Sequence, residues 1–186
     1  MTKGMPGIVK VMLALATVGV AVATFFGLRG CEASRSGFGK DGTVTARIAG
    51  RTFHLEPALD DATRNKGLGG RTEIAADGGM IFVFREPMVQ EFVMRDCPIP
   101  IDIAFLDDLG RVLAMHEMQP EAPRGADERA DVPQENWKYE NRLKRYSSRF
   151  AARFAIELRA GTLRSLHVRP GDVVRFDYEA LKAAAR

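Results

Sequence analysis

The chain has 186 residues, of which 46% are hydrophobic and 27% charged, a composition typical of a single globular domain. This hydrophobic fraction is large enough to form a core, which excludes a wholly disordered protein. The net charge of +3 comes from the N-terminus, because residues 1–40 hold five basic residues and one acid, whereas the remainder holds 22 basic and 23 acidic residues. A nucleic-acid-binding domain needs clustered cations on its folded part, so this distribution argues against a nucleic acid as partner.

The N-terminus carries the pattern of a secretory signal or membrane anchor. Lys3 and Lys10 precede residues 11–28, which form an 18-residue segment without a charge. A positive region before an apolar one is typical of a signal, and this length also suffices for a tilted membrane span. We therefore expect residues 1–31 to be a signal or transmembrane helix in the cell membrane, with the following domain facing the periplasm or the outside.

Cys31 ends a segment that resembles a bacterial lipobox. Residues 28–31 read Leu-Arg-Gly-Cys, with a small residue before the cysteine, although Arg29 departs from the usual pattern. Cys31 is therefore a candidate lipidation site, and a disulfide with Cys97 is the alternative. A retained anchor, a lipoprotein and a cleaved signal all remain open. Residues 32–42 are rich in glycine and serine and are predicted to form a flexible tether.

Residues 43–186 are predicted to form one β-rich domain. Alternating apolar residues at 43–48 and 51–55 predict a hairpin, and residues 57–66 predict a short helix that begins near Asp60 or Asp61 and stops at Gly67. Further elements are strands at 80–84, 90–94, 101–106, 111–115, 154–158 and 173–178, one helical turn at 162–166 and a short helical tail at 179–186. About seven short strands with one or two short helices favour an α+β fold built as a small barrel or sandwich.

A long charged excursion at 117–149 interrupts the strand pattern. It holds Trp137, the only tryptophan, with Tyr139 and Tyr146 among lysines and arginines. Connections in compact domains have a median length of about 4–6 residues, so a longer one suggests a function. Aromatic residues beside arginine are common in interfaces, which makes these three the candidate partner-binding residues. The alternative is an amphipathic helix that covers the domain's own core.

Four blocks of the chain are similar to a known bacterial and archaeal family. They are RNKGLGGR at 64–71, GMIFVF at 79–84, FVMRDCPIPIDIAFL at 92–106 and ELRAG at 157–161. They resemble the domain of unknown function 192, whose pattern is R-x-x-G-L-M-x-R, G-M-L-F-x-F, F-W-M-K-N-T-x-x-P-L-D-I-x-F and L-E-L-x-A-G. The chain departs from it at Gly69, at Val93 and at 95–97. The resemblance implies a shared fold, and secretion or membrane tethering, but no established activity.

The candidate ligand-binding residues lie in or beside these blocks. Asp102 sits inside an apolar strand, where a carboxylate is costly unless it is paired. Arg71 and Arg95 can bind a carboxylate through two parallel hydrogen bonds, so we expect these three residues to form a polar site at the domain's mouth. The alternative is that Asp102 accepts backbone N–H bonds from a neighbouring turn. Arg64 and Met94 belong to the same candidate set.

Glu157 is the other acid in an apolar strand. Strand alternation places Ile156 and Leu158 inward and predicts a solvent-facing Glu157 as one reading. The other reading pairs Glu157 with Asp102 for acid–base catalysis, which requires the two carboxyl groups to meet.

No motif for a cofactor or a metal ion accompanies these residues. His54, His116 and His167 lack metal-ligand spacing, and the chain has no nucleophile elbow, P-loop or dinucleotide motif. The sequence thus favours a membrane-tethered, extracytoplasmic binding or accessory module over an enzyme. Its expected partners are the membrane and a small molecule or envelope protein. The alternatives are an envelope-directed hydrolase that uses Asp102 and Glu157, and a protein–protein interaction domain that uses 134–149.

Overall fold

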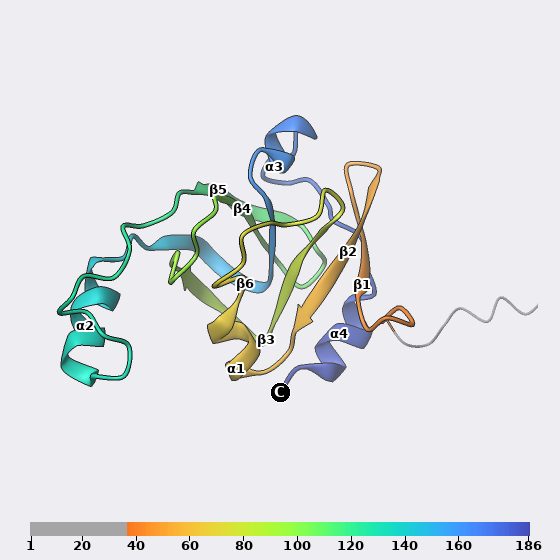
Figure 1. Cartoon of the computed structure of the whole chain (residues 1–186). Helices are drawn as coiled ribbons and strands as arrows, with labels where there is room; N and C mark the ends of the chain where they lie inside the picture. The colour runs from red at the N-terminus through yellow and green to blue at the C-terminus, as the bar shows by residue number, and fades with distance from the viewer. Residues whose placement is uncertain (1–36) are drawn as a thin grey trace, which may run out of the picture. The chain divides into compact units, whose positions relative to one another are not determined.

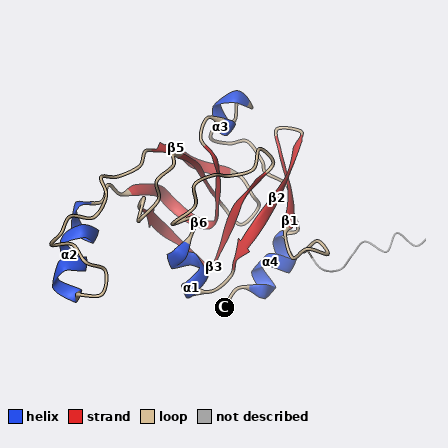
Figure 2. Ribbon diagram, in the orientation of Figure 1, coloured by secondary structure: helices blue, strands red, loops and turns tan. Residues whose placement is uncertain are grey.

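Six strands and four short helices make up residues 37–186, the part of the chain that the computed structural model describes (Figure 1). The strands are β1 (Val44–Ile48), β2 (Arg51–Ala58), β3 (Gly78–Phe92), β4 (Ile101–Leu106), β5 (Val112–Met118) and β6 (Tyr146–Arg159). The helices are α1 (Asp61–Lys66), α2 (Pro133–Arg142), α3 (Thr162–Ser165) and α4 (Tyr178–Ala184). They surround one mixed sheet, so the prediction of a β-rich α+β domain is confirmed (Figure 2).

The predicted anchor at 1–31, with Cys31, lies outside the described residues. Within 37–186, no helix combines the length and the apolar character that a membrane crossing requires.

The sheet has the order β1-β2-β3-β6-β4-β5 and is open, with β1 and β5 at its edges. Neighbouring strands are antiparallel except β2 and β3, which are parallel. The connection between these two strands contains α1 and the glycine-rich loop at 67–70. We expected a barrel or a sandwich. The described strands instead form one sheet, and residues 172–175 run between its edges through single bridges at Arg47–Arg175 and Arg111–Val173. The prediction of a last strand at 173–178 is therefore wrong, because these residues form isolated bridges and not a continuous row of strand hydrogen bonds.

Two strands are longer than the sequence pattern predicted. Pro87 does not end the strand that starts at Gly78, because the register between β3 and β6 shifts between Val83 and Met88. A proline has no backbone N–H to donate. At this irregularity the strand makes no ladder hydrogen bond that would need one, so Pro87 fits there. β6 begins at Tyr146, well before the expected start at 154.

The predicted helix after β2 is confirmed. Asp60 is the N-cap of α1 and accepts a 2.8 Å hydrogen bond from the Thr63 N–H, while the Thr63 hydroxyl accepts one from the Asp60 N–H. This reciprocal pair is a capping box. Gly67 ends the helix with a φ of 50°, which favours glycine.

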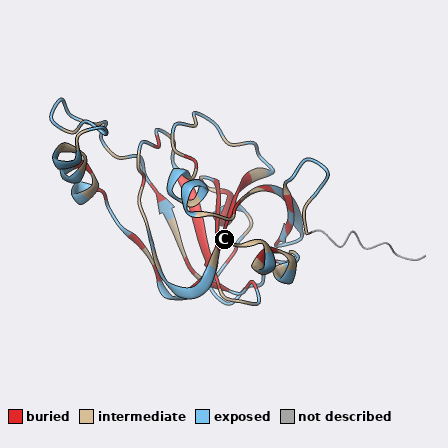
Figure 3. Cartoon of the chain, turned by 90° about the horizontal axis from the view of Figure 1, so that it is seen from below, coloured by how far each residue is buried: buried red, intermediate tan, exposed pale blue. Residues whose placement is uncertain are grey.

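Apolar side chains are buried on both faces of the sheet. Alternation along β6 sends Phe154, Ile156 and Leu158 to one face and Ala155 and Glu157 to the other. The first face, here called the closed face, packs against apolar residues of α3, α4 and the segment that bridges the edges: Leu163, Val174 and Leu181. The second, here called the pocket face, packs Phe82, Met94 and Phe105 with apolar residues of the loops at 68–74 and 94–99. Figure 3 shows the central strands as mostly buried and α2 as mostly exposed.

Candidate functional site

A pocket of about 490 Å³ opens on the pocket face. Its walls come from α1 with the glycine-rich loop, from β3, from the segment 93–97 and from Glu157 of β6. Phe82, Phe84 and Phe92 form an aromatic wall, in which Phe92 lies edge-on to Phe82 at 4.9 Å and to Phe84 at 6.3 Å between ring centroids. The volume falls within the range of about 300–1,000 Å³ that is common for small-molecule sites.

Glu157 is the most unusual residue that lines this pocket. Its side chain is buried, and its Oε2 atom makes no hydrogen bond to any described residue. Burial raises the pKa of this carboxyl group to about 8, because the charged form loses its hydration. Most buried polar atoms have a hydrogen-bond partner, so an unpartnered carboxyl oxygen in a pocket points to a ligand. The prediction of a solvent-facing Glu157 is wrong, because the face opposite Ile156 is a second core.

The pocket brings together four of the six predicted ligand-binding residues: Arg64, Met94, Arg95 and Glu157. The two arginines already have partners. Arg64 donates to the Val83 carbonyl at 2.8 Å and to Asp61 at 2.7 Å. Arg95 binds both oxygens of Glu140, at 2.5 and 2.7 Å, and this contact raises the pKa of the guanidinium. Neither arginine therefore serves as the counter-ion of Glu157.

Arg71 and Asp102 lie away from this pocket. Arg71 binds Glu56 through two hydrogen bonds of 2.5 and 2.6 Å. Asp102 accepts a 2.8 Å hydrogen bond from the Leu163 N–H at the start of α3. Burial raises the pKa of Asp102, and the backbone hydrogen bonds from Leu163 and Gly161 oppose that shift. The structure thus does not assemble the expected site of Arg71, Arg95 and Asp102, and Asp102 takes the alternative role of binding a turn.

Asp102 and Glu157 also project from opposite faces of the sheet. Residues that pair directly across strands share a face, and β4 pairs Asp102 with Leu158 and Ile103 with Glu157. Asp102 therefore belongs to the closed face and Glu157 to the pocket face. The expectation that these carboxyl groups meet for acid–base catalysis is wrong, because the sheet itself separates them.

The charged excursion forms α2, which lies at the opposite end of the domain from β1 and α4 (Figure 1). Of its three predicted partner-binding residues, only Trp137 is exposed, at 67%. Tyr139 is buried between two guanidinium groups, with Arg124 at 3.7 Å and Arg142 at 4.8 Å from its ring centre. Tyr146 is buried as well, and its hydroxyl accepts a hydrogen bond from the Gln119 N–H. Both tyrosines are therefore buried in the domain itself, Tyr139 on α2 and Tyr146 at the start of β6.

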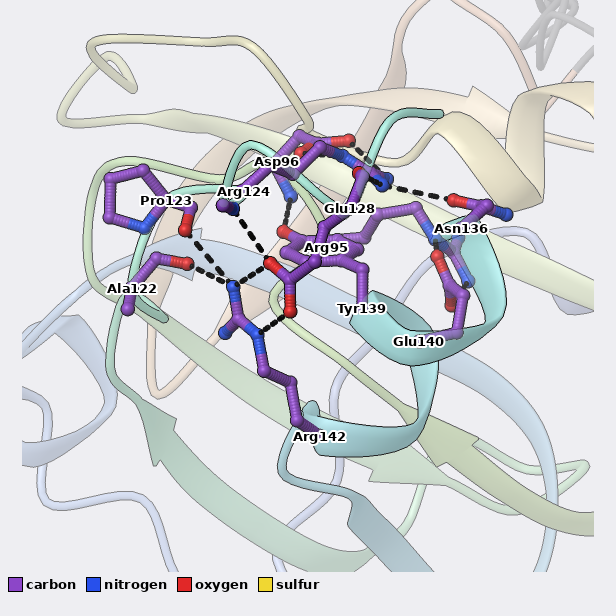
Figure 4. A network of polar contacts seen from close by, with 11 residues as sticks. Arg95, Asp96, Ala122, Pro123, Arg124, Glu128, Asn136, Tyr139, Glu140 and Arg142 are labelled. Carbon is purple, nitrogen blue, oxygen red and sulfur yellow. Dashed lines mark hydrogen bonds and ion pairs between the residues drawn. The ribbon is translucent and has the colours of Figure 1, made fainter. Parts of the chain in front are cut away.

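Polar contacts join α2 to the pocket wall (Figure 4). Glu140 holds Arg95, and the Tyr139 hydroxyl accepts a 2.9 Å hydrogen bond from the Asp96 N–H. The Asp96 carboxylate in turn accepts bonds of 2.9 and 3.1 Å from Arg124. Asp96 has a φ of 48°, an uncommon value for a residue other than glycine, so these contacts fix a specific turn in the segment 93–97.

Sequence reasoning missed the aromatic wall and Gln90. Phe82 and Phe84 are two residues apart in an apolar run, a spacing that predicts a shared strand face but not which face is open. Gln90 lines the pocket, and its Nε2 atom, like Glu157 Oε2, is buried without a hydrogen-bond partner in the described part of the chain. No signal in the sequence distinguishes Gln90 from a surface glutamine. Among residues 37–186, no group of three or more His, Cys, Asp or Glu is placed to hold a metal ion.

The comparisons with known proteins agree with this fold. The profile of DUF192, described as "Uncharacterized ACR, COG1430", matches residues 43–176. The chain belongs to this family. A crystal structure from Sinorhizobium meliloti 1021, described as a "putative transcription regulator", is 26% identical and has a TM-score of 0.55. The match covers 72% of this chain and 91% of that chain. The crystal structure of a protein of unknown function from Novosphingobium aromaticivorans DSM 12444 is 24% identical and has a TM-score of 0.57. The match covers 72% of this chain and 84% of that chain, and it shows the fold alone. No curated protein matches the chain.

Proposed function

We propose that this DUF192 protein is a membrane-tethered, extracytoplasmic module that binds a small molecule in the pocket beside Glu157. The Glu157 carboxyl group carries the proposal, because its Oε2 atom has no hydrogen-bond partner among the described residues and a ligand in this pocket can supply one. The wall of phenylalanines adds the apolar surface that drives small-molecule binding. The apolar, lysine-flanked segment at 11–28 supports membrane tethering and a domain that faces the periplasm or the outside.

A thermal-shift screen of the full chain in a mild detergent tests this function. A ligand that binds only the folded state increases the free energy of unfolding by about 2.7 kcal/mol at 100 times Kd. This stabilisation raises the melting temperature. We expect at least one compound to stabilise the protein and to lose this effect in the Phe84→Ala variant, which opens the aromatic wall. Arg71→Ala is the matched control, since Arg71 lies outside the pocket. A shift that Arg71→Ala removes and Phe84→Ala keeps would place the site elsewhere.

The location of the domain has its own test. Protease added to intact spheroplasts should degrade the domain while a cytoplasmic marker survives. A domain that stays intact until the membrane is permeabilised would contradict the extracytoplasmic placement.

A second candidate function is capture of an envelope protein by α2. The observation that favours it is Trp137, which is 67% exposed on a helix that ion pairs hold in place. Tryptophan is enriched among the residues that dominate interface energetics. In a crosslinking and pull-down experiment, Trp137→Ala should lose the partner while Phe150→Ala, a second exposed aromatic, keeps it. Equal capture by both variants and the unchanged protein would exclude this surface.

A further inference from the structure

Among the described residues, no basic side chain forms an ion pair with Glu157. The raised pKa of its carboxyl group has burial as its sole cause, with no contribution from a neighbouring cation. Arg64 and Arg95 are occupied by Asp61 and Glu140, as described above. The pocket therefore presents a buried acid whose ionised form lacks a partner among the described residues, and a ligand can supply that partner.

The Oε2 atom and an aromatic ring face the same small space. A Cβ atom added to Gly67 would lie 3.8 Å from Glu157 Oε2 and 3.5 Å from Cζ of Phe82. Phe82 is in edge contact with Phe92, and Phe84 completes the wall. A ligand in this space would meet both the Glu157 carboxyl group and the apolar ring of Phe82.

The glycine-rich loop offers nothing that would favour an anion instead. The N–H groups of Gly67, Gly69 and Gly70 donate to the carbonyls of Thr63, Lys66 and Asp96 at 3.0, 3.1 and 2.9 Å. An anion-binding loop needs N–H groups that are free to donate. An anionic ligand beside Glu157 would also repel its carboxylate form.

The charges around the rim nearly balance. The basic groups are Arg64, Lys66, Arg85 and Arg95, and the acidic ones are Asp61, Glu86 and Glu91. Cys97 also lines the pocket, and burial raises the pKa of its thiol. Burial also raises the pKa of the Glu157 carboxyl group, to about 8.

We propose that the pocket takes a protonated organic amine with an aromatic or aliphatic body, its ammonium group bound to Glu157 and its body against Phe82, Phe84 and Phe92. This inference rests on the proposed binding function and names its ligand class. An ammonium with N–H donors satisfies the unpartnered Oε2 atom, which a quaternary ammonium would not do. Gln90 lies farther along the pocket wall, where its amide can bind a polar group on the body of the ligand.

Isothermal titration calorimetry of the full chain in detergent tests the ligand class with three matched probes. They are 2-phenylethylamine, neutral 2-phenylethanol and anionic 3-phenylpropanoate. The amine should bind most tightly, and its affinity should rise about tenfold per pH unit from pH 6 towards 8, because binding requires the ionised carboxylate. Below pH 8 each binding event should release one proton, seen as an enthalpy that depends on the buffer.

Two variants separate Glu157 from other acids. Glu157→Gln should lose amine binding and its pH dependence but retain the weak affinity for 2-phenylethanol. Asp102→Asn, which alters the buried acid of the opposite face, should bind the amine as the unchanged protein does. Circular dichroism and melting curves confirm that both variants are folded.

The outcomes also distinguish the inference from the function on which it rests. If 2-phenylethanol or 3-phenylpropanoate binds more tightly than the amine, or if Glu157→Gln keeps the amine, the amine proposal is wrong and small-molecule binding stands. If neither these probes nor any compound in the thermal-shift screen binds, both proposals are wrong.

Discussion

On the closed face of the sheet Asp102 accepts a hydrogen bond from the Leu163 N–H, whereas on the pocket face Glu157 Oε2 accepts none from residues 37–186. Both acids sit in apolar strands, both are buried, and burial raises the pKa of both. The difference comes from what covers each face. α3 brings a helix start to Asp102, but the loops over Glu157 leave a pocket. A buried acid is therefore structural when a backbone donor reaches it and a candidate binding group when none does.

The largest expected contrast concerns two phenylalanines. Phe154 is fully buried on the closed face and packs edge-on against Phe176 at 5.0 Å, whereas Phe84 is a half-buried pocket wall. Phe154→Ala should lower the free energy of unfolding by about 3–5 kcal/mol, because it leaves a cavity in a close-packed core. Phe84→Ala should cost less than half as much. Urea denaturation followed by circular dichroism measures both, and equal losses would remove the distinction between the faces.

The pH dependence of stability isolates Glu157. Its folded-state pKa of about 8 lies above the unfolded value of 4.5, so the folded protein binds more protons between these values. The free energy of unfolding should therefore fall as the pH rises from 4.5 to 8, by at most about 1.4 kcal/mol per pH unit from this group.

The comparison protein for this measurement is Glu157→Gln, which cannot titrate at that position. The stability of the variant relative to the unchanged protein should increase with pH and level off above pH 8. Parallel curves for the two proteins across pH 5–9 would show that Glu157 has an ordinary pKa.

Replacing each acid by leucine should give the smallest effects, with opposite signs. Asp102→Leu removes the acceptor of the buried Leu163 N–H and should destabilise the fold by about 1–3 kcal/mol. Glu157→Leu removes an unpartnered polar group and should leave stability unchanged or raise it by about 1 kcal/mol. Chemical denaturation at pH 7 measures both. A loss of stability in Glu157→Leu that matches Asp102→Leu would mean that Glu157 has a structural partner.

Local sequence signals predicted much of the fold. The hairpin of β1 and β2, the capping box of α1 and the turn before β5 depend on residues that are neighbours in sequence, so their patterns are visible without the tertiary structure. Sequence reasoning missed the continuation of β3 through Pro87 and the early start of β6. These two segments pair with each other, and that pairing joins residues far apart in the sequence. The membrane anchor and Cys31 stay predictions.

The sequence by itself determined the family, the β-rich class and the presence of two acids in apolar strands. Only the tertiary structure decided that Arg71 binds Glu56, that Arg95 binds Glu140 and that Glu157, in contrast to Asp102, lines the pocket. The physical reason is that period-two alternation tells which residues share a face of a strand, while the cover over each face comes from segments distant in sequence. Whether a buried acid finds a donor depends on that cover.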